Sequence, residues 1–212
     1  MILIIFFSIL FHELCHAIVS KIFNRKISKI TILPFGTIFE VDSNDNINLL
    51  EELLIVLAGP LGSLFLMMFD DLYSINRIIL IFNLLPIYPL DGGKIIETLL
   101  CKVFNFKLVL KIIYVNSIIF SFSMIIIGVV YSSINFVIIG VALLIINLKN
   151  IDELEIRYWN FLSDKLITKR MLPLKLVKTN NQNNFYRGYN NLFISKKGLL
   201  NEVDIIKINK YT

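Results

Sequence analysis

The stretch LFHELCHAIVS, residues 10–20, places two histidines and a glutamate in the middle of a long apolar run. That run, residues 1–23, would be about 34 Å long as a helix, which is enough to cross a bilayer. Glu13 is its only charge before Lys21. Because ionisable side chains are costly inside a membrane, a cluster of them within a span indicates a functional site.

The two histidines and the glutamate form the motif H-E-x-x-H, residues 12–16. On a helix His12 and His16 share one face, so both imidazoles can bind a single metal ion. Glu13 lies next to that face, where it can reach a water at the metal without being a ligand. The motif therefore predicts a zinc site with Glu13 as the catalytic base. The alternative is a pair of buried, hydrogen-bonded histidines that only pack a helix bundle.

A catalytic zinc site needs a third protein ligand besides the two histidines. Asp91 in NLLPIYPLDGGKI, residues 83–95, is the best candidate, because the prolines and glycines around it predict a broken helix and a sharp turn. That turn would direct its carboxylate back towards the first span. Glu97 is a competing ligand, and an ordinary turn aspartate is the alternative for Asp91. At such a site Glu13 would accept a proton from the attacking water and deliver it to the leaving amine, which is amide hydrolysis.

The composition is that of an integral membrane protein. Hydrophobic residues make up 56% of the 212 residues and charged residues only 17%, and the mean hydropathy is +0.74. A soluble domain of this length carries more charge and fewer apolar runs. We therefore expect an all-α multi-pass membrane fold with about five transmembrane helices, at residues 1–23, 53–69, 75–90, 112–131 and 134–148.

The distribution of basic residues predicts how the chain is oriented. Lysines and arginines are concentrated after the first segment, after the third and in the tail after the fifth. By the positive-inside rule these parts are cytosolic, which puts Met1 outside and leads us to expect a further span upstream of it. Hydrolysis needs water at the zinc, so we expect the active site to open to the cytosolic side.

Residues 27–45, ISKITILPFGTIFEVDSND, predict a short membrane-associated β-hairpin that turns at Pro34-Phe35-Gly36. Because bare backbone cannot face lipid, this hairpin should lie at the interface or line a protein cavity. Its edge strand could hold an extended substrate by strand addition. We therefore count Pro34, Phe35 and Gly36 among the candidate substrate-binding residues.

Residues 149–212 predict a small cytosolic α/β tail that follows a membrane domain of residues 1–148. The tail holds twelve Lys and Arg against six Asp and Glu, whereas residues 1–148 hold nine against ten. Residues 149–170 predict an amphipathic helix that could pack on the membrane surface or on a partner helix. Further on, Arg187 and Lys196 are interpreted as solvated charges. We expect no nucleic-acid binding, because the tail does not combine basic and aromatic residues as known modules do.

The chain resembles the site-2 protease family of intramembrane zinc metalloproteases in four landmarks that occur in the same order. They are FHELCH (residues 11–16), LPFG (33–36), LAGPLG (57–62) and FNLLPIYPLDGGKI (82–95). The match is closest to the sporulation type that processes a sigma-factor precursor. The resemblance implies that His12, His16 and Asp91 bind zinc, that Glu13 is the base and that Asn83 helps to hold substrate. For Asn83 a helix–helix hydrogen bond is the alternative.

The resemblance also bears on the tail and on one cysteine. It implies that the tail corresponds to a nucleotide-sensing CBS domain, here a shortened remnant for which we do not infer ATP binding. Cys15 stands where such proteins usually have glycine. A thiol at this position either competes for the zinc or serves as a small packing residue.

The predicted function is hydrolysis of a peptide bond in a membrane-associated regulatory protein, by resemblance a sporulation sigma-factor precursor. Candidate partners are this substrate, inhibitory membrane proteins and a second copy of the chain. The alternative is a non-catalytic zinc-binding membrane scaffold or a metal transporter. A transporter needs polar residues along its spans, and the fourth and fifth segments offer few. The presence of Glu13 also favours an enzyme over an inactive relative.

Overall fold

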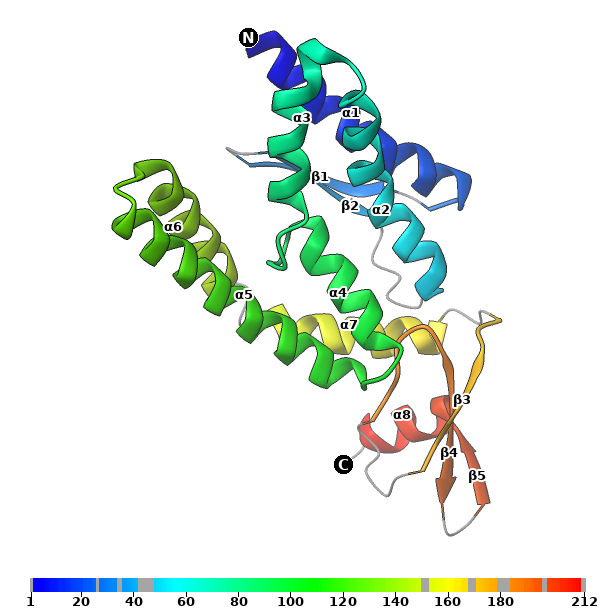
Figure 1. The fold of residues 1–212 in the computed structure, drawn as a ribbon. Coiled ribbons are helices and arrows are strands. Elements are labelled where there is room, and N and C mark those ends of the chain that lie inside the picture. The colour runs from blue at the N-terminus through cyan, green and yellow to red at the C-terminus, as the bar shows by residue number, and fades with distance from the viewer. Residues whose placement is uncertain are drawn as a thin grey trace. The chain divides into compact units, whose positions relative to one another are not determined.

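The computed structural model describes residues 2–25, 27–33, 36–41, 48–149, 153–167, 171–178, 184–195 and 198–210. It is mostly helical and divides into two units (Figure 1). Unit 1 comprises Met1–Ser43 and Leu50–Ile96, and unit 2 comprises Asn44–Leu49 and Glu97–Thr212. The predicted domain division after residue 148 stays a prediction.

Unit 1 is an apolar helix cluster. Its helices are α1 (Ile2–Ile22), α2 (Leu49–Leu66), α3 (Asp70–Asn83) and the beginning of α4 (Asp91–Cys101). A buried hydrogen bond of 3.0 Å from Asn76 Nδ2 to Ser8 Oγ joins α3 to α1. An ion pair between Arg25 and Glu51 joins the chain just after α1 to the first turn of α2.

The predicted hairpin is present in unit 1. Strands β1 (Ile27–Leu33) and β2 (Gly36–Val41) pair in antiparallel fashion, with Leu33 opposite Gly36. Pro34 and Phe35 lie outside the described residues, and the side chains of residues 26–47 are not described either. The substrate-binding role of Pro34, Phe35 and Gly36 therefore stays a prediction.

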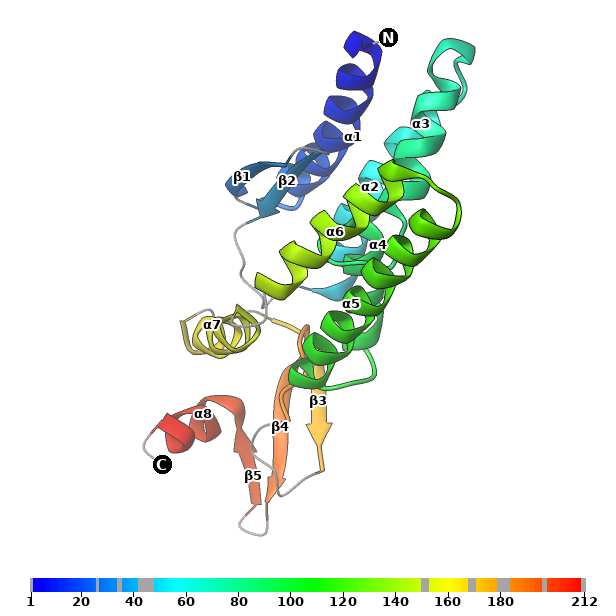
Figure 2. The same ribbon diagram turned by 90° about the vertical axis from the view of Figure 1, so that its left-hand side faces the viewer.

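Unit 2 contains a helical hairpin followed by a small α/β tail. Helices α5 (Phe106–Val130) and α6 (Ile134–Lys149) run side by side and are joined by a turn in which Ser132 has a φ of 51° (Figure 2). The tail contains α7 (Glu153–Ile167), β3 (Leu174–Val177), β4 (Asn190–Ser195), β5 (Gly198–Asn201) and α8 (Glu202–Lys210). In its sheet β3 is parallel to β4, and β4 is antiparallel to β5.

The number of spans that the described helices support is smaller than predicted. Three of them are long and apolar enough to cross a membrane, namely α1, α2 and α5, and α6 with α7 would be a fourth if this bent pair is one span. The predicted third span falls short because α3 begins at Asp70 and ends at Asn83, just before the prolines. Its 14 residues extend about 21 Å, less than the hydrocarbon thickness. Five spans are thus not established by the fold.

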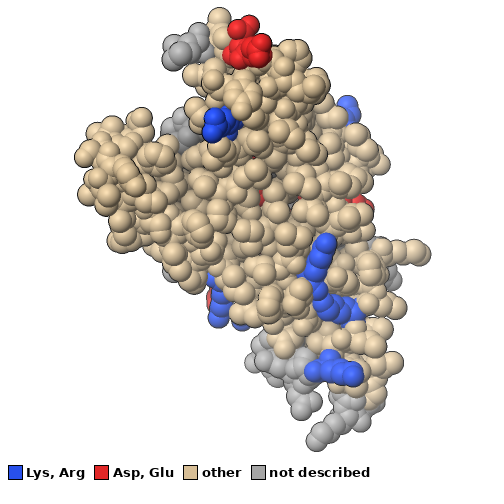
Figure 3. All heavy atoms as spheres, viewed as in Figure 1, with Lys and Arg blue, Asp and Glu red and all other residues tan. Residues whose placement is uncertain are grey.

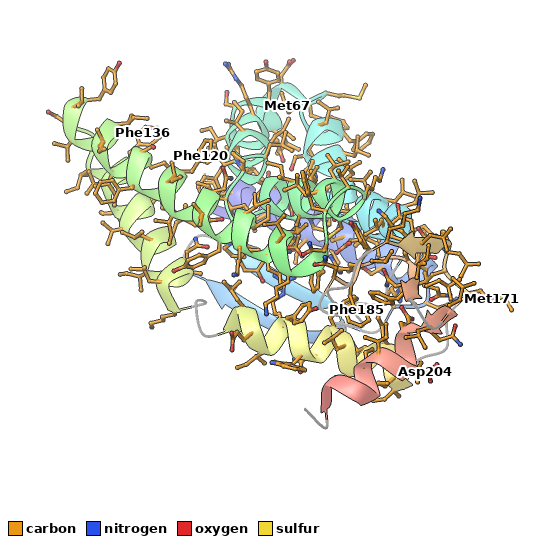
Figure 4. All side chains as sticks on the ribbon, turned by 90° about the horizontal axis from the view of Figure 1, so that it is seen from below. Met67, Phe120, Phe136, Met171, Phe185 and Asp204 are labelled. Atoms are coloured by element: carbon orange, nitrogen blue, oxygen red, sulfur yellow. The ribbon has the colours of Figure 1, made fainter. Side chains whose placement is uncertain are left out.

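The candidate spans are apolar outside and carry polar groups inside. Phe120 and Phe136 project from α5 and α6 (Figure 4) and are exposed. Buried Ser117 and Ser121 instead donate to carbonyl oxygens of their own helix, at 2.8 and 2.7 Å. The face drawn in Figure 3 carries few charged side chains over most of its area. This distribution suits helices surrounded by lipid, where every polar group needs an internal partner.

Replacing Gly140 with leucine is expected to destabilise the contact between α5 and α6. A Cβ at residue 140 would lie 2.8 Å from Ile125 Cγ1 and 3.1 Å from the Ser121 carbonyl oxygen. Overpacking of this kind costs about 1–3 kcal/mol, so the thermal unfolding temperature in detergent should fall. Val141→Leu on the exposed side of α6 is the matched control and should leave that temperature unchanged. Equal stability of the two variants would contradict this packing.

Candidate metal centre

One face of α1 is polar and buried, although the helix as a whole is apolar. Ser8, His12, His16 and Ser20 follow one another at intervals of four residues, and all are buried. Only 2% of His12 and 9% of His16 is exposed. The helical period therefore lines up the two predicted ligands on the side of α1 that faces the rest of unit 1.

The structure brings the three predicted metal ligands together. Asp91 Oδ2 lies 3.0 Å from His12 Nε2 and 3.2 Å from His16 Nε2. The two Nε2 atoms are 3.3 Å apart. The ligand atoms of His12, His16 and Asp91 are therefore close enough to share one metal ion. Among the described residues, these three form the group of His, Cys, Asp or Glu side chains that meets this condition.

Asp91 reaches the histidines because the chain between α3 and α4 folds tightly. It is the first residue of α4, and the turn before it is closed by a hydrogen bond of 2.8 Å from the Leu90 amide to the Ile87 carbonyl oxygen. Gly92 and Gly93 pack directly against this turn. A Cβ at Gly93 would lie 2.7 Å from the Ile87 carbonyl oxygen, and one at Gly92 would overlap the carbonyl of Leu84. Both glycines are therefore needed for the close approach of backbone to backbone.

Helix α2 orients both imidazoles by contacting their Nδ1 atoms. His16 Nδ1 lies 2.8 Å from the carbonyl oxygen of Ile55, and His12 Nδ1 lies 2.8 Å from Ser63 Oγ, which is fully buried. A carbonyl oxygen can only accept, so Nδ1 of His16 carries the proton and donates it. In the neutral ring the lone pair is then on Nε2, the atom that faces Asp91.

This donor set fits a metal cation. Two imidazole nitrogens and one carboxylate oxygen lie within 3.3 Å of one another, so a cation between them would be attracted to all three. Two histidines and one carboxylate also form one of the known catalytic zinc ligand sets. Gly59 of α2 keeps the spot open, because a Cβ there would overlap Nε2 of His16 and crowd that of His12.

Glu13 lies beside the metal group without belonging to it. Its half-buried carboxylate is close enough to interact electrostatically with His16, Asp91 and Lys94. This arrangement is the one expected of a base that acts next to a metal, and the role itself stays a prediction.

Glu97, the competing candidate for the third metal ligand, pairs with two arginines instead. Its buried carboxylate accepts a hydrogen bond of 2.8 Å from Arg157 Nη2 and one of 3.3 Å from Arg187 Nη1. Arg187 is itself buried, so its interpretation as a solvated charge was wrong. A buried carboxylate needs such partners, and a pair of arginines in the fold meets that need.

Asn83 is the last residue of α3, and its Nδ2 donates to the Ile79 carbonyl oxygen of the same helix at 3.1 Å. Its substrate-holding role stays a prediction.

Cys15 packs against α2, where a Cβ at Gly62 would overlap its sulfur. The thiol thus fills space next to a glycine, which favours the packing role over zinc binding.

Sequence reasoning missed the contribution of α2. Gly59, Ser63 and Ile55 contact the histidines, whereas LAGPLG served only as a landmark of the family resemblance. The spacing of four between Gly59 and Ser63 is a signal that could have been used, since it matches the spacing of His12 and His16 and puts both residues on one face.

A family comparison agrees with this geometry. The model of Peptidase family M50 matches residues 1–69 and 65–129. The chain belongs to this family. Stage IV sporulation protein FB of Bacillus subtilis is 36% identical over 114 residues, 47% of this chain and 40% of that protein. Zinc metalloprotease MJ0392 of Methanocaldococcus jannaschii is 34% identical over 122 residues, 49% of this chain and 35% of that protein. The chain thus spans less than half the length of these relatives.

A solved structure supports the same assignment. The Site-2 Protease from Methanocaldococcus jannaschii has a TM-score of 0.58 and 26% identity, over 69% of this chain and 75% of that one. Site-2 proteases are integral membrane proteins, which agrees with the apolar helices α1, α2 and α5. The M50 relatives are zinc metalloproteases, so zinc is the metal that this His₂Asp group would hold.

Ser63→Ala is expected to weaken zinc binding about 10- to 100-fold, because the His12 ring loses the partner that fixes its orientation. The measurement is a competition titration with a chromophoric zinc chelator in detergent. Ser74→Ala is the matched control, since Ser74 is exposed on α3. Unchanged zinc affinity in the Ser63 variant would show that α2 does not support the ligand.

Proposed function

We propose that the chain is an intramembrane zinc endopeptidase that hydrolyses a peptide bond of a membrane-associated protein. The observation that carries this proposal is the convergence of His12 Nε2, His16 Nε2 and Asp91 Oδ2 at one buried spot. Membership of Peptidase family M50 supports the same reaction.

The residues have separate roles in the proposed reaction. A zinc ion at the His₂Asp group would polarise the scissile carbonyl and make water more acidic. Glu13 accepts the proton from the attacking water and then delivers it to the leaving nitrogen. The Ile55 carbonyl keeps the proton of His16 on Nδ1, and Ser63 holds the His12 ring from the same side, so both rings present Nε2.

The proposed substrate is a regulatory protein of the sporulation sigma-factor precursor type. The likeness to Stage IV sporulation protein FB supports a sporulation role. The β1–β2 hairpin would bind an extended substrate segment by strand addition, and Pro34, Phe35, Gly36 and Asn83 are the proposed substrate-binding residues. Inhibitory membrane proteins and a second copy of the chain are further proposed partners.

The proposed setting is a multi-pass membrane domain of about five spans whose active site opens to the cytosol. Basic loops support this orientation, and the apolar exteriors of α1, α2 and α5 support insertion. The alternative of a metal transporter is disfavoured, because Ser117 and Ser121 bond to their own helix instead of lining a path.

Glu13→Gln is expected to abolish cleavage of a co-expressed candidate substrate and to leave zinc content unchanged. Loss of a general base costs typically 10²–10⁴-fold in rate, while the three ligands remain in place. Substrate processing is followed by immunoblot, and zinc is measured on the purified protein by mass spectrometry. Asp71→Asn, an exposed change on α3, is the control and should cleave normally. Cleavage at the full rate by the Glu13 variant would show that the base is misassigned.

A further inference from the structure

Helix α7 packs against the beginning of the α5 span. Phe161 of α7 is fully buried, and its ring centre is 4.8 Å from that of Phe106, the first residue of α5. Tyr158 lies on the same face of α7, 6.5 Å from Phe106 and 5.5 Å below Lys107 Nζ. The buried face of α7 is therefore fixed at the end of α5 where its charged residues lie.

Helix α6 ends on the same side of the hairpin but does not reach Phe106. The two helices are antiparallel and joined by a tight turn, and α6 has 16 residues against 25 in α5, so Lys149 lies about nine residues, or ~13 Å, short of Phe106 along the hairpin. Helix α7 begins after α6 at Glu153 and is bent from it by 55°. Figure 2 shows α7 almost end-on beside that end of the hairpin, so its axis crosses those of α5 and α6.

Exposed lysines indicate where this end of the α5–α6 hairpin would lie relative to a bilayer. Lys107 and Lys111 lie in the first two turns of α5, and Lys149 is the last residue of α6. All three are exposed. In a transmembrane hairpin such residues lie among the lipid headgroups, and they favour anionic ones. Helix α7 is packed at the outer limit of the range that these lysines span, against Phe106 and Lys107.

The outer face of α7 carries three exposed apolar side chains, with exposed Ser163 between them and Asn160 beside them. Ile156 is 56% exposed, Trp159 is 58% exposed and Ile167 is 80% exposed. On a helical wheel these three side chains fall within one stripe, opposite the buried Tyr158 and Phe161. Met171, four residues beyond the helix, is also exposed and lies at the outer edge in Figure 4. Exposed apolar patches need a partner, and tryptophan is enriched at the membrane interface.

We propose that α7 is an interfacial helix that inserts the Ile156–Trp159–Ile167 face into the phospholipid headgroup layer, at the surface where α5 begins. Lys107 and Lys111 bind anionic headgroups beside it. This proposal goes beyond the catalytic role and does not depend on it.

The consequence is that α7 holds the tail at the membrane surface. Lys165 of α7 is 3% exposed, and its ammonium donates to the Tyr189 carbonyl oxygen at 2.7 Å and to Glu202 Oε2 at 2.9 Å. These buried contacts join α7 to the chain just before β4 and to the first residue of α8. An anchored α7 therefore anchors the small sheet as well.

The experiment uses Trp159, the one tryptophan of the chain, as a fluorescent probe of depth. The full chain is reconstituted in vesicles of phosphatidylcholine and phosphatidylglycerol that carry a nitroxide either on the headgroup or in the middle of an acyl chain. An interfacial helix reaches only about 5–10 Å into the boundary, so the shallow label should quench roughly twofold more than the deep label. Iodide in the aqueous phase should quench weakly.

The matched control is the double variant Trp159→Phe/Phe120→Trp, which moves the probe to an exposed position in the middle of α5. It should be quenched most by the deep label, and this sets the depth scale. Strongest quenching of Trp159 by the deep label would overturn the proposal, because α6 and α7 would then be one bent span. Efficient iodide quenching without lipid quenching would also overturn it and would leave a protein partner as the occupant of this face.

Discussion

The whole of unit 1 depends on holding two imidazole nitrogens and a carboxylate oxygen together in an apolar surrounding. These atoms approach within 3.3 Å of one another. A metal cation at this spot would be attracted to all three atoms, and low polarity strengthens that attraction. Metal binding and helix packing are therefore coupled, because free energy gained at the metal also stabilises the contacts of α1 with α2 and α4. Gly59 allows the approach, and Ile55 and Ser63 orient the two rings.

The ligands could be predicted from the sequence because each has a local signal. His12 and His16 are four residues apart in an apolar helix, and the prolines and glycines around Asp91 define the break that turns it inward. The contribution of α2 had only the spacing of four between Gly59 and Ser63 as a signal, since Ile55 acts through its backbone and Ser63 through a tertiary contact with His12. Local patterns do not specify which helix faces which, and those residues follow only from the packed structure.

The departures from the sequence-based expectations have physical causes as well. The third apolar segment forms only α3, because hydropathy averages over prolines that end a helix. Arg187 has a charge that local sequence assigns to solvent, but Glu97 is buried, and a buried carboxylate requires a cationic partner. In the tail, burial of Lys165 against Glu202 follows the same rule. Buried ion pairs between distant residues are where single-sequence reasoning fails.

A zinc X-ray absorption spectrum of the metal-loaded protein tests the central assignment most directly. Coordination by His12, His16 and Asp91 predicts nitrogen and oxygen atoms at about 2.0–2.2 Å, with the scattering pattern of two imidazoles and no sulfur. A sulfur scatterer at about 2.3 Å would identify a cysteine ligand instead. That result, or a signal from fewer than two imidazoles, would contradict the His₂Asp site.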